Sequence, residues 1–382
     1  MYLKSSWLGG AVSSTTTGRD TVLADTVTEF DDDLGQGAQR RRTALWIGGL
    51  SAGLLVTLVL AVGLGAVAID PGTVARIVGH HALGSPADVT WTRAEDSIVW
   101  QVRLPRVILG AVVGAALAVC GVALQAMVRN LLADPYLLGV TSGASTGAAA
   151  AILFGLGAGF GENALSASAF LGALGASAAV FVVARAGGRI TSLRLLMAGV
   201  AVGYALYAAT SFLIFASDSA EGARSVLFWL LGSLGLARWS WPLAIVVVVV
   251  ALTLAALLLW RRRLDALAIG DETAHTLGVP PTRFRVQLLV VVSLCVGAVV
   301  AASGGIGFVG LVIPHVARRF VGAAHGRVVP VAALIGAIFL VWADVAARTV
   351  LEPRELPIGI ITALVGAPFL LILVRRFHSA GA

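Results

Sequence analysis

The charged residues with the clearest spacing lie at 261–280, between two long apolar runs. Asp271 can cap a helix over residues 272–277, Gly278 can end that helix, and Pro280 cannot continue it. The pattern therefore predicts a short helix, a break and a second short helix. A compact, capped helix with charged side chains is a shape that a second protein can bind. An ordinary solvated loop is the alternative interpretation.

The sequence lacks the residue patterns that usually indicate a catalytic, nucleotide-binding or metal site. The single lysine, Lys4, follows Leu3, so the phosphate-binding motif G-x-x-x-x-G-K-[ST] is absent and the chain has no P-loop for ATP. Cys120 and Cys295 stand singly in apolar runs without a nearby Cys or His, which argues against a disulfide and a metal site. The apolar runs also lack paired carboxylates and the zinc motif H-E-x-x-H. We therefore expect no catalytic residue, no metal and no cofactor.

The composition indicates an all-α membrane protein that crosses the bilayer many times. Of the 382 residues, 58% are hydrophobic and 12% are charged, which is more apolar surface than a soluble domain can bury. Ten apolar windows are long enough, or nearly so, to cross. They cover residues 44–68, 107–127, 136–157, 166–184, 195–216, 241–260, 286–303, 306–321, 328–344 and 357–374. The run 226–236 is too short and is expected to form a surface or re-entrant helix.

The chain divides into a disordered tail at 1–43, a ten-helix domain at 44–376 and a short tail at 377–382. The first tail is polar and poor in aromatic residues, and it ends in three arginines before the first window. It lacks an apolar segment of its own, so we do not expect a cleaved signal peptide.

Arginine placement predicts the orientation. Ten crossings put both termini on one side, and that side collects 19 of the 27 lysine and arginine residues. By the positive-inside rule, both termini and the 261–280 stretch are cytoplasmic.

The windows carry few ionisable side chains. The cores of nine of the ten have none, and His315, which follows Pro314, is the exception. Ion-coupled carriers usually need ionisable or unwound polar sites at this depth, so we expect the energy for transport to come from outside the membrane. An ion-coupled secondary transporter and a multi-pass membrane enzyme are the alternatives.

Glycine spacing predicts close helix pairs. Gly110 and Gly114, and then Gly139, Gly143 and Gly147, recur every four residues, which places each set on one helix face. Windows two to five and seven to ten enter from opposite sides, which predicts an inverted repeat.

Polar residues between the windows have two interpretations each. The cytoplasmic turns 129–136 and 187–192 are simple connections or, in a two-fold dimer, close the inner mouth of a central path. On the other face, Arg103 and Arg106 open the second window and Arg348 follows the ninth. These arginines anchor at the headgroups or pair with carboxylates of a soluble partner.

Four sets of motifs resemble one family. R-L-P-R at 103–106 with L-L-A-D-P at 131–135, G-D-E-T-A at 270–274 with L-G-V-P at 277–280, the run 304–315, and E-L-P-I-G at 355–359 with G-A-P at 366–368 stand in the family's order. They resemble permeases of the iron–siderophore, haem and vitamin B12 ABC importers. The resemblance covers roughly residues 44–376, and the first 43 residues have no counterpart in it.

The resemblance implies a ten-helix subunit in the plasma (inner) membrane of a bacterium. The subunit would dimerise, as a homodimer or heterodimer, around a central pathway. Cytoplasmic ATPase subunits would bind below it, and an extracytoplasmic binding protein or lipoprotein would dock above. Membrane lipid surrounds it, and no nucleic-acid partner is expected. The implied cargo is an iron chelate, with a ferric siderophore first and haem or cobalamin as alternatives.

The resemblance also implies roles for individual residues. Arg103, Arg106 and Arg348 would meet glutamates of the binding protein, although Arg354 replaces the small residue expected on that edge. The segment that binds the ATPase would comprise Asp265, Leu267, Gly270, Asp271, Glu272, Ala274, Leu277 and Gly278. The cytoplasmic gate would comprise Asn130, Leu132, Thr191 and Ser192.

Overall fold

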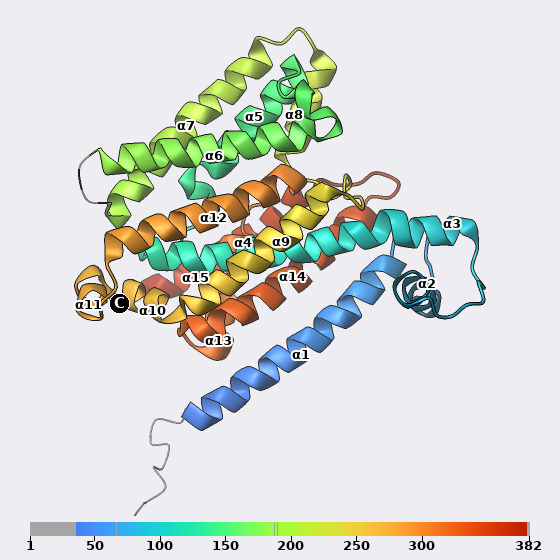
Figure 1. Ribbon diagram of the computed structural model, residues 1–382, viewed down its shortest axis with the longest axis horizontal. Helices are drawn as coiled ribbons and strands as arrows, with labels where there is room; N and C mark the ends of the chain where they lie inside the picture. The colour runs from blue at the N-terminus through green and yellow to red at the C-terminus, as the bar shows by residue number, and fades with distance from the viewer. Residues whose placement is uncertain (1–35, 66, 187, 189, 380–382) are drawn as a thin grey trace, which may run out of the picture. The chain divides into compact units, whose positions relative to one another are not determined.

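The computed structural model describes residues 36–65, 67–186, 188 and 190–379, and every regular element in them is a helix (Figure 1). Most of the predicted tail 1–43 and the end of the predicted tail 377–382 lie outside these residues. The helices are α1 (Gln36–Gly63), α2 (Pro71–Leu83), α3 (Arg93–Asp96), the π-helix η1 (Ser97–Arg103), α4 (Leu104–Val128), the 3-10 helix η2 (Pro135–Leu138), α5 (Val140–Phe154), the 3-10 helix η3 (Ala158–Asn163), α6 (Ala164–Arg185), α7 (Ser192–Phe215), α8 (Ala220–Leu230), α9 (Trp241–Leu259), α10 (Arg261–Ile269), α11 (Asp271–Thr276), α12 (Pro281–Ser303), α13 (Val309–Val321), α14 (His325–Thr349) and α15 (Ile358–Ser379).

Each predicted apolar window overlaps one helix of 13 residues or more. Apolar runs of this length form helices because a helix satisfies all its own backbone hydrogen bonds away from water. Among the described residues, seven helices are long and apolar enough to cross a membrane. The helices of the third, eighth and tenth windows, α5, α13 and α15, fall outside that set.

Several boundaries differ from the sequence analysis, and three of them change how a segment is interpreted. Helix α1 begins at Gln36, so residues 36–43 are helical although they were assigned to the tail. The eighth window begins with a non-helical segment, and α13 starts only at Val309. The short helix expected at 226–236 is α8, which ends earlier, at Leu230.

Helix α2 corresponds to no apolar window. The side chain of Asp70 caps it by accepting hydrogen bonds from the backbone N–H groups of Gly72 and Thr73, at 2.9 and 3.2 Å. Gly84 ends it in a left-handed conformation with φ 70°. These cap residues are readable in the sequence, but the helix is too polar and too short to show as a window.

The core of the unit 43–382 is arranged around α4. This helix packs against α9, α12, α13 and α14, while α5, α6 and α7 form a neighbouring group that joins it through α12 (Figure 1). Two ends of the bundle follow from the direction of α4. We call them the Arg106 end, where α4 begins, and the Asp271 end, where α4 finishes near α11.

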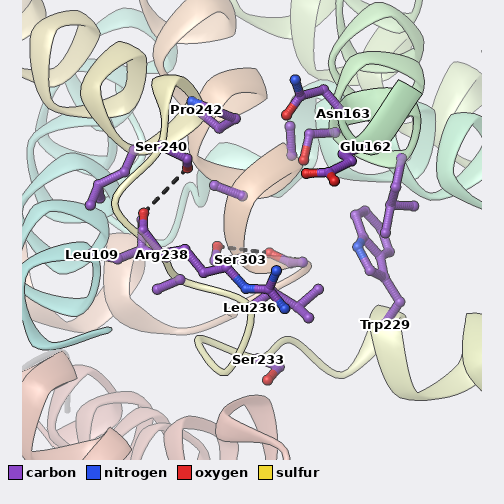
Figure 2. A pocket seen from close by; sticks show the side chains of 17 residues that line it. Leu109, Glu162, Asn163, Trp229, Ser233, Leu236, Arg238, Ser240, Pro242 and Ser303 are labelled. Carbon is purple, nitrogen blue, oxygen red and sulfur yellow. Dashed lines mark hydrogen bonds between the residues drawn. The ribbon is translucent and has the colours of Figure 1, made fainter. Parts of the chain in front are cut away.

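The segment between α8 and α9 returns over the Arg106 end (Figure 2). The backbone N–H of Ser233 donates to the carbonyl of Ser303 at 2.8 Å, which fixes this segment to the last turn of α12. It carries Leu236, Arg238 and Ser240 to the mouth of a cavity described below.

Glycines make two of the helix contacts very close, which confirms the predicted role of Gly114, Gly143 and Gly147 but not that of Gly139, which precedes α5, or of Gly110, which faces mainly side chains. A Cβ atom at Gly114 of α4 would overlap the carbonyl oxygen of Gly336 on α14. A Cβ at Gly143 of α5 would likewise overlap the carbonyl of Gly172 on α6. Gly147 meets the α6 backbone at Ser168 in the same way. Small residues here let backbone approach backbone.

We expect Gly114→Val to destabilise the protein strongly, because the carbonyl that would be displaced belongs to a helix backbone that cannot rotate away. Overpacking typically costs about 1–3 kcal/mol, and we expect a value at the upper end of this range. Thermal melting of the purified protein in detergent measures the loss. Gly175→Val is the matched control, because a Cβ on this α6 glycine meets open space. Equal melting temperatures for the two variants would contradict the prediction.

Candidate functional site

The stretch 261–280 forms two short helices, as predicted. Helix α10 ends at Ile269, Gly270 interrupts the helical conformation, and α11 follows from Asp271 to Thr276. Gly278 has φ 76° and ends α11, which confirms its predicted role. The predicted cap is wrong, because Gly270 takes the N-cap position and Asp271, with its carboxylate, is the first residue of α11. That carboxylate is held by an arginine instead.

One side of this stretch is anchored and the other is open. Leu267 of α10 and Ala274 of α11 are fully buried. Ile269 and Leu277 are 69% and 63% exposed, and Glu272 is also exposed. Exposed apolar side chains beside a charge form the kind of patch that a protein partner covers.

Arg285 of α12 connects this stretch to two other helices. Its side chain is 1% exposed in total, and it donates to both carboxylate oxygens of Asp271 at 2.6 and 2.9 Å. The same guanidinium donates to the carbonyl of Met127, at the end of α4, at 3.2 Å. It also donates to Ser192 Oγ, at the start of α7, at 3.1 Å. The sequence analysis gave Arg285 no role in this stretch, although its position directly before the apolar window 286–303 was a usable signal.

The predicted gate residues lie around this arginine. Ser192 Oγ donates to the Met127 carbonyl at 3.2 Å, so Ser192 and Arg285 share this acceptor. Thr191 caps α7 by accepting from the N–H of Arg194 at 3.3 Å. Asn130 Oδ1 accepts from the N–H of Leu132 at 2.9 Å and shapes the turn after α4. The fold thus brings Ser192 into contact with the Asp271 stretch through Arg285, and Asn130 and Leu132 follow the end of α4.

Asp265 attaches α10 to the beginning of α14. Its Oδ1 accepts from the backbone N–H of His325 at 2.8 Å and lies 2.6 Å from His325 Nδ1. Burial alone would raise the pKa of Asp265, but the hydrogen bonds from His325 outweigh it and lower that pKa. The carboxylate is therefore held in its charged form at neutral pH.

Asp134 sits in the turn between α4 and η2, where it accepts from the N–H of Tyr136 at 2.9 Å. Burial raises its pKa to about 6. The fold therefore binds the proton more tightly than the unfolded chain, whose aspartates have a pKa of about 3.9. The protonated Asp134 side chain therefore stabilises the fold fully below the unfolded pKa of about 3.9. This stabilisation is lost as the pH rises through the folded pKa of about 6.

We expect Asp134→Asn to remove this part of the pH dependence. The variant should melt higher than the unchanged protein at about pH 8, by a few degrees, and the difference should vanish by about pH 4. Thermal melting of both proteins over this range checks it. Asp218→Asn, at an exposed loop position, is the control. Parallel curves for the Asp134 variant and the unchanged protein would contradict the prediction.

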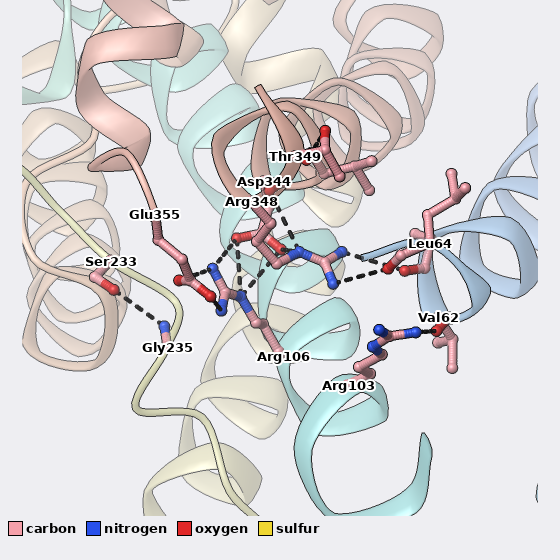
Figure 3. A network of polar contacts seen from close by, with 12 residues as sticks. Val62, Leu64, Arg103, Arg106, Ser233, Gly235, Asp344, Arg348, Thr349 and Glu355 are labelled. Atoms are coloured by element: carbon pink, nitrogen blue, oxygen red, sulfur yellow. Dashed lines mark hydrogen bonds and ion pairs between the residues drawn. The ribbon is translucent and has the colours of Figure 1, made fainter. Parts of the chain in front are cut away.

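The Arg106 end holds a buried network of charges (Figure 3). Arg106 donates to Asp344 at 3.0 Å and, with both terminal nitrogens, to Glu355 at 3.0 and 2.9 Å. Arg348 forms an ion pair with the same Asp344 at 3.1 Å. It also donates to backbone carbonyls at the end of α1. Arg103 lies beside this network and donates to three carbonyls of residues 62–67.

The three arginines predicted to dock a partner are thus brought to one end, but they are only 7–8% exposed. Buried charges are stable only when they are paired, and the intrachain acceptors meet that need. The sequence analysis did not foresee Asp344 and Glu355 as these acceptors. Glu355, with its side chain 53% exposed, is the charge of the network that reaches solvent.

Comparison with known proteins shows which family has this sequence and fold. The FecCD transport family model matches residues 53–376. The cobalamin import system permease protein BtuC of Halobacterium salinarum is 46% identical over 295 residues, which cover 77% of this chain and 78% of that protein. The hemin transport system permease protein HmuU of Yersinia pestis is 41% identical over 293 residues, covering 75% and 86%.

A solved structure shares the fold. It is described as an inward-facing ABC transporter assigned to the metal-chelate type, and it superposes with a TM-score of 0.74 at 34% identity. The similarity covers 86% of this chain and 98% of that one. The family match, the two curated relatives and this structure agree, and the chain belongs to the FecCD transport family of ABC importer permeases.

Proposed function

We propose that this chain is the membrane subunit of an ATP-driven importer that takes up a metal chelate from a binding protein. The observation that carries the proposal is the match over residues 53–376 to a family whose relatives are named as cobalamin and hemin permeases. The cargo would be a chelated metal, with a ferric siderophore, haem and cobalamin as the candidates. The subunit would perform no bond chemistry of its own.

The proposed arrangement has ten crossings, with both termini in the cytoplasm of a bacterium. Ten apolar windows that each overlap one helix of 13 residues or more support it, as does the excess of arginine on the terminal side. The Asp271 end would then face the cytoplasm and the Arg106 end would face outward. The partners would be a second permease subunit, two ATPase subunits and the binding protein.

The ATPase would bind the open side of the 261–280 stretch. Ile269, Glu272 and Leu277 would form the contact, while Leu267 and Ala274 hold the stretch to the bundle. Movement of α11 would pass through Arg285 to the end of α4 and the start of α7, because its guanidinium bonds to both. Those helix ends carry the proposed gate, with Asn130 and Leu132 after α4 and with Thr191 and Ser192 at α7.

The binding protein would dock at the Arg106 end. Arg103, Arg106 and Arg348 would act from beneath the surface, because they already have acceptors within the chain. A carboxylate of the binding protein would compete with Glu355, the exposed partner of Arg106. Exposed ion pairs are individually weak, at about 0–1 kcal/mol, so such contacts would orient the partner more than hold it.

Reconstitution tests the proposal. The permease would be placed in proteoliposomes with its ATPase and binding protein, and uptake of labelled ferric siderophore, hemin and cobalamin would be followed. We expect one of these chelates to accumulate only when ATP and both partners are present. Accumulation by the permease alone, driven by an ion gradient and without nucleotide, would identify an ion-coupled secondary transporter and refute the proposal.

A further inference from the structure

A cavity of about 450 Å³ with charged, polar and apolar lining residues opens at the Arg106 end, between the beginnings of α6 and α9 and the end of α12 (Figure 2). Its charged lining residues are Glu162 and Arg238, and Asn163, Ser240 and Ser303 add uncharged polar groups. Neither charged side chain forms an ion pair with any residue that the structure describes. The cavity therefore offers one cation and one anion that lack partners of opposite charge.

An apolar groove of about 280 Å³ continues from this cavity. The two share the lining residues Asn163, Ser166, Pro242, Ala301 and Ala302, so they adjoin. The rest of the groove is lined almost entirely by apolar side chains of α6, α9 and α12, and the list is Ala167, Phe170, Trp241, Ile245, Val246, Val249 and Ala298. A cavity with charged side chains beside an apolar groove can bind an amphiphile, which has a charged end and an apolar end.

Exposed tryptophans beside the cavity indicate that it lies at the level of lipid headgroups. Trp239 and Trp241 are exposed beside it, and tryptophan gathers where a bilayer meets water. Helix α9 runs from this level along the groove, and Ile245, one turn further on, is exposed like a lipid-facing side chain. The groove thus begins where an acyl chain would leave its headgroup.

From this charge pattern we infer a binding site for a zwitterionic glycerophospholipid with a primary ammonium group, such as phosphatidylethanolamine. Arg238 would hold the phosphate, because guanidinium groups recognise phosphate by charge-assisted hydrogen bonds. Glu162 and Asn163 would accept hydrogen bonds from the ammonium. One acyl chain would lie in the groove. The site is separate from the Asp271 end and does not depend on the proposed transport function.

Lipid retention in native mass spectrometry tests this inference. The full chain would be reconstituted in nanodiscs of equal parts phosphatidylethanolamine, phosphatidylcholine and phosphatidylglycerol, then released and weighed with its bound lipid. We expect phosphatidylethanolamine to be retained above its share. Arg238→Gln should reduce retention of all three lipids about tenfold, the change that the loss of about 1.4 kcal/mol of binding produces. Arg354→Gln, at an exposed arginine outside the cavity, should leave retention unchanged.

Two further variants distinguish the contribution of the lipid headgroup to binding from that of the acyl chain. Glu162→Gln should keep phosphate binding but remove the preference for phosphatidylethanolamine over phosphatidylglycerol. Ala302→Phe should fill the groove and lower lipid retention while Arg238 remains. Equal retention by the unchanged protein, Arg238→Gln and Ala302→Phe would overturn the inference. Displacement of the bound lipid by inorganic phosphate, with Ala302→Phe having no effect, would assign the cavity to a free anion and would also overturn it.

Discussion

Replacing Arg285 by methionine is expected to uncouple ATP hydrolysis from uptake in the reconstituted importer. Methionine fills similar space, but it cannot donate to Asp271, Met127 or Ser192. Helix α11 would then move without pulling on α4 and α7. We expect uptake per ATP hydrolysed to fall tenfold or more, which corresponds to about 1.4 kcal/mol of lost coupling. Both rates are measured in the same proteoliposomes.

Arg283→Met is the matched control, because Arg283 is an exposed arginine one half-turn earlier on the same helix. Arg285→Lys should give an intermediate result, since a lysine keeps the charge but lacks the planar fork that bonds to two oxygens. The remaining Asp271 carboxylate is 34% exposed and can be hydrated, so the variant should still fold. If uptake per ATP stays unchanged in Arg285→Met, the arginine has only a structural role.

Replacing Asp344 by asparagine is expected to cause the largest loss of stability among single changes at the Arg106 end. Asp344 is 2% exposed and lies between Arg106 and Arg348, both of which are also buried. Removing its charge leaves two buried guanidinium groups without their shared counter-ion. Breaking a buried ion pair in this way costs about 3–5 kcal/mol. Thermal melting and the yield of folded protein measure the effect.

Substitutions of two nearby carboxylates serve as comparisons for Asp344→Asn. Glu352→Gln changes an exposed residue at the same end and should have no effect. Glu355→Gln removes the exposed partner of Arg106 and should cost only about 0–1 kcal/mol, because solvent screens that pair. A melting temperature for Asp344→Asn as high as that of Glu352→Gln would show that the network does not stabilise the fold.

The helices could be predicted because each long one is an uninterrupted apolar run with polar ends. Helix α9 is the clearest example, since the window 241–260 differs from Trp241–Leu259 by one residue. Helix α2 was not predicted because its residues do not form such an apolar run. The start of α13 was placed too early, at residue 306, because Ile306, Gly307 and Phe308 read as apolar but are not helical here.

The candidate site was predicted less completely than the fold. The break at Gly270 and the stop at Gly278 are local and were readable in the sequence. The partner of Asp271 is not local, because it depends on how α11 folds back on α12. The pairing of Arg106 with Asp344 joins residues 238 positions apart, so the spacing of the arginines alone suggested a surface role. Tertiary contacts decided both cases.

The glycine contacts have a consequence for how the molecule can change shape. Backbones that pack closely at Gly114 and Gly336, or at Gly143 and Gly172, should resist sliding and twisting within either pair of helices. We therefore expect each pair to move as a unit, with the hinge between the pairs. Spin labels placed within one pair would keep their separation through a transport cycle, and labels placed on different pairs would report the motion.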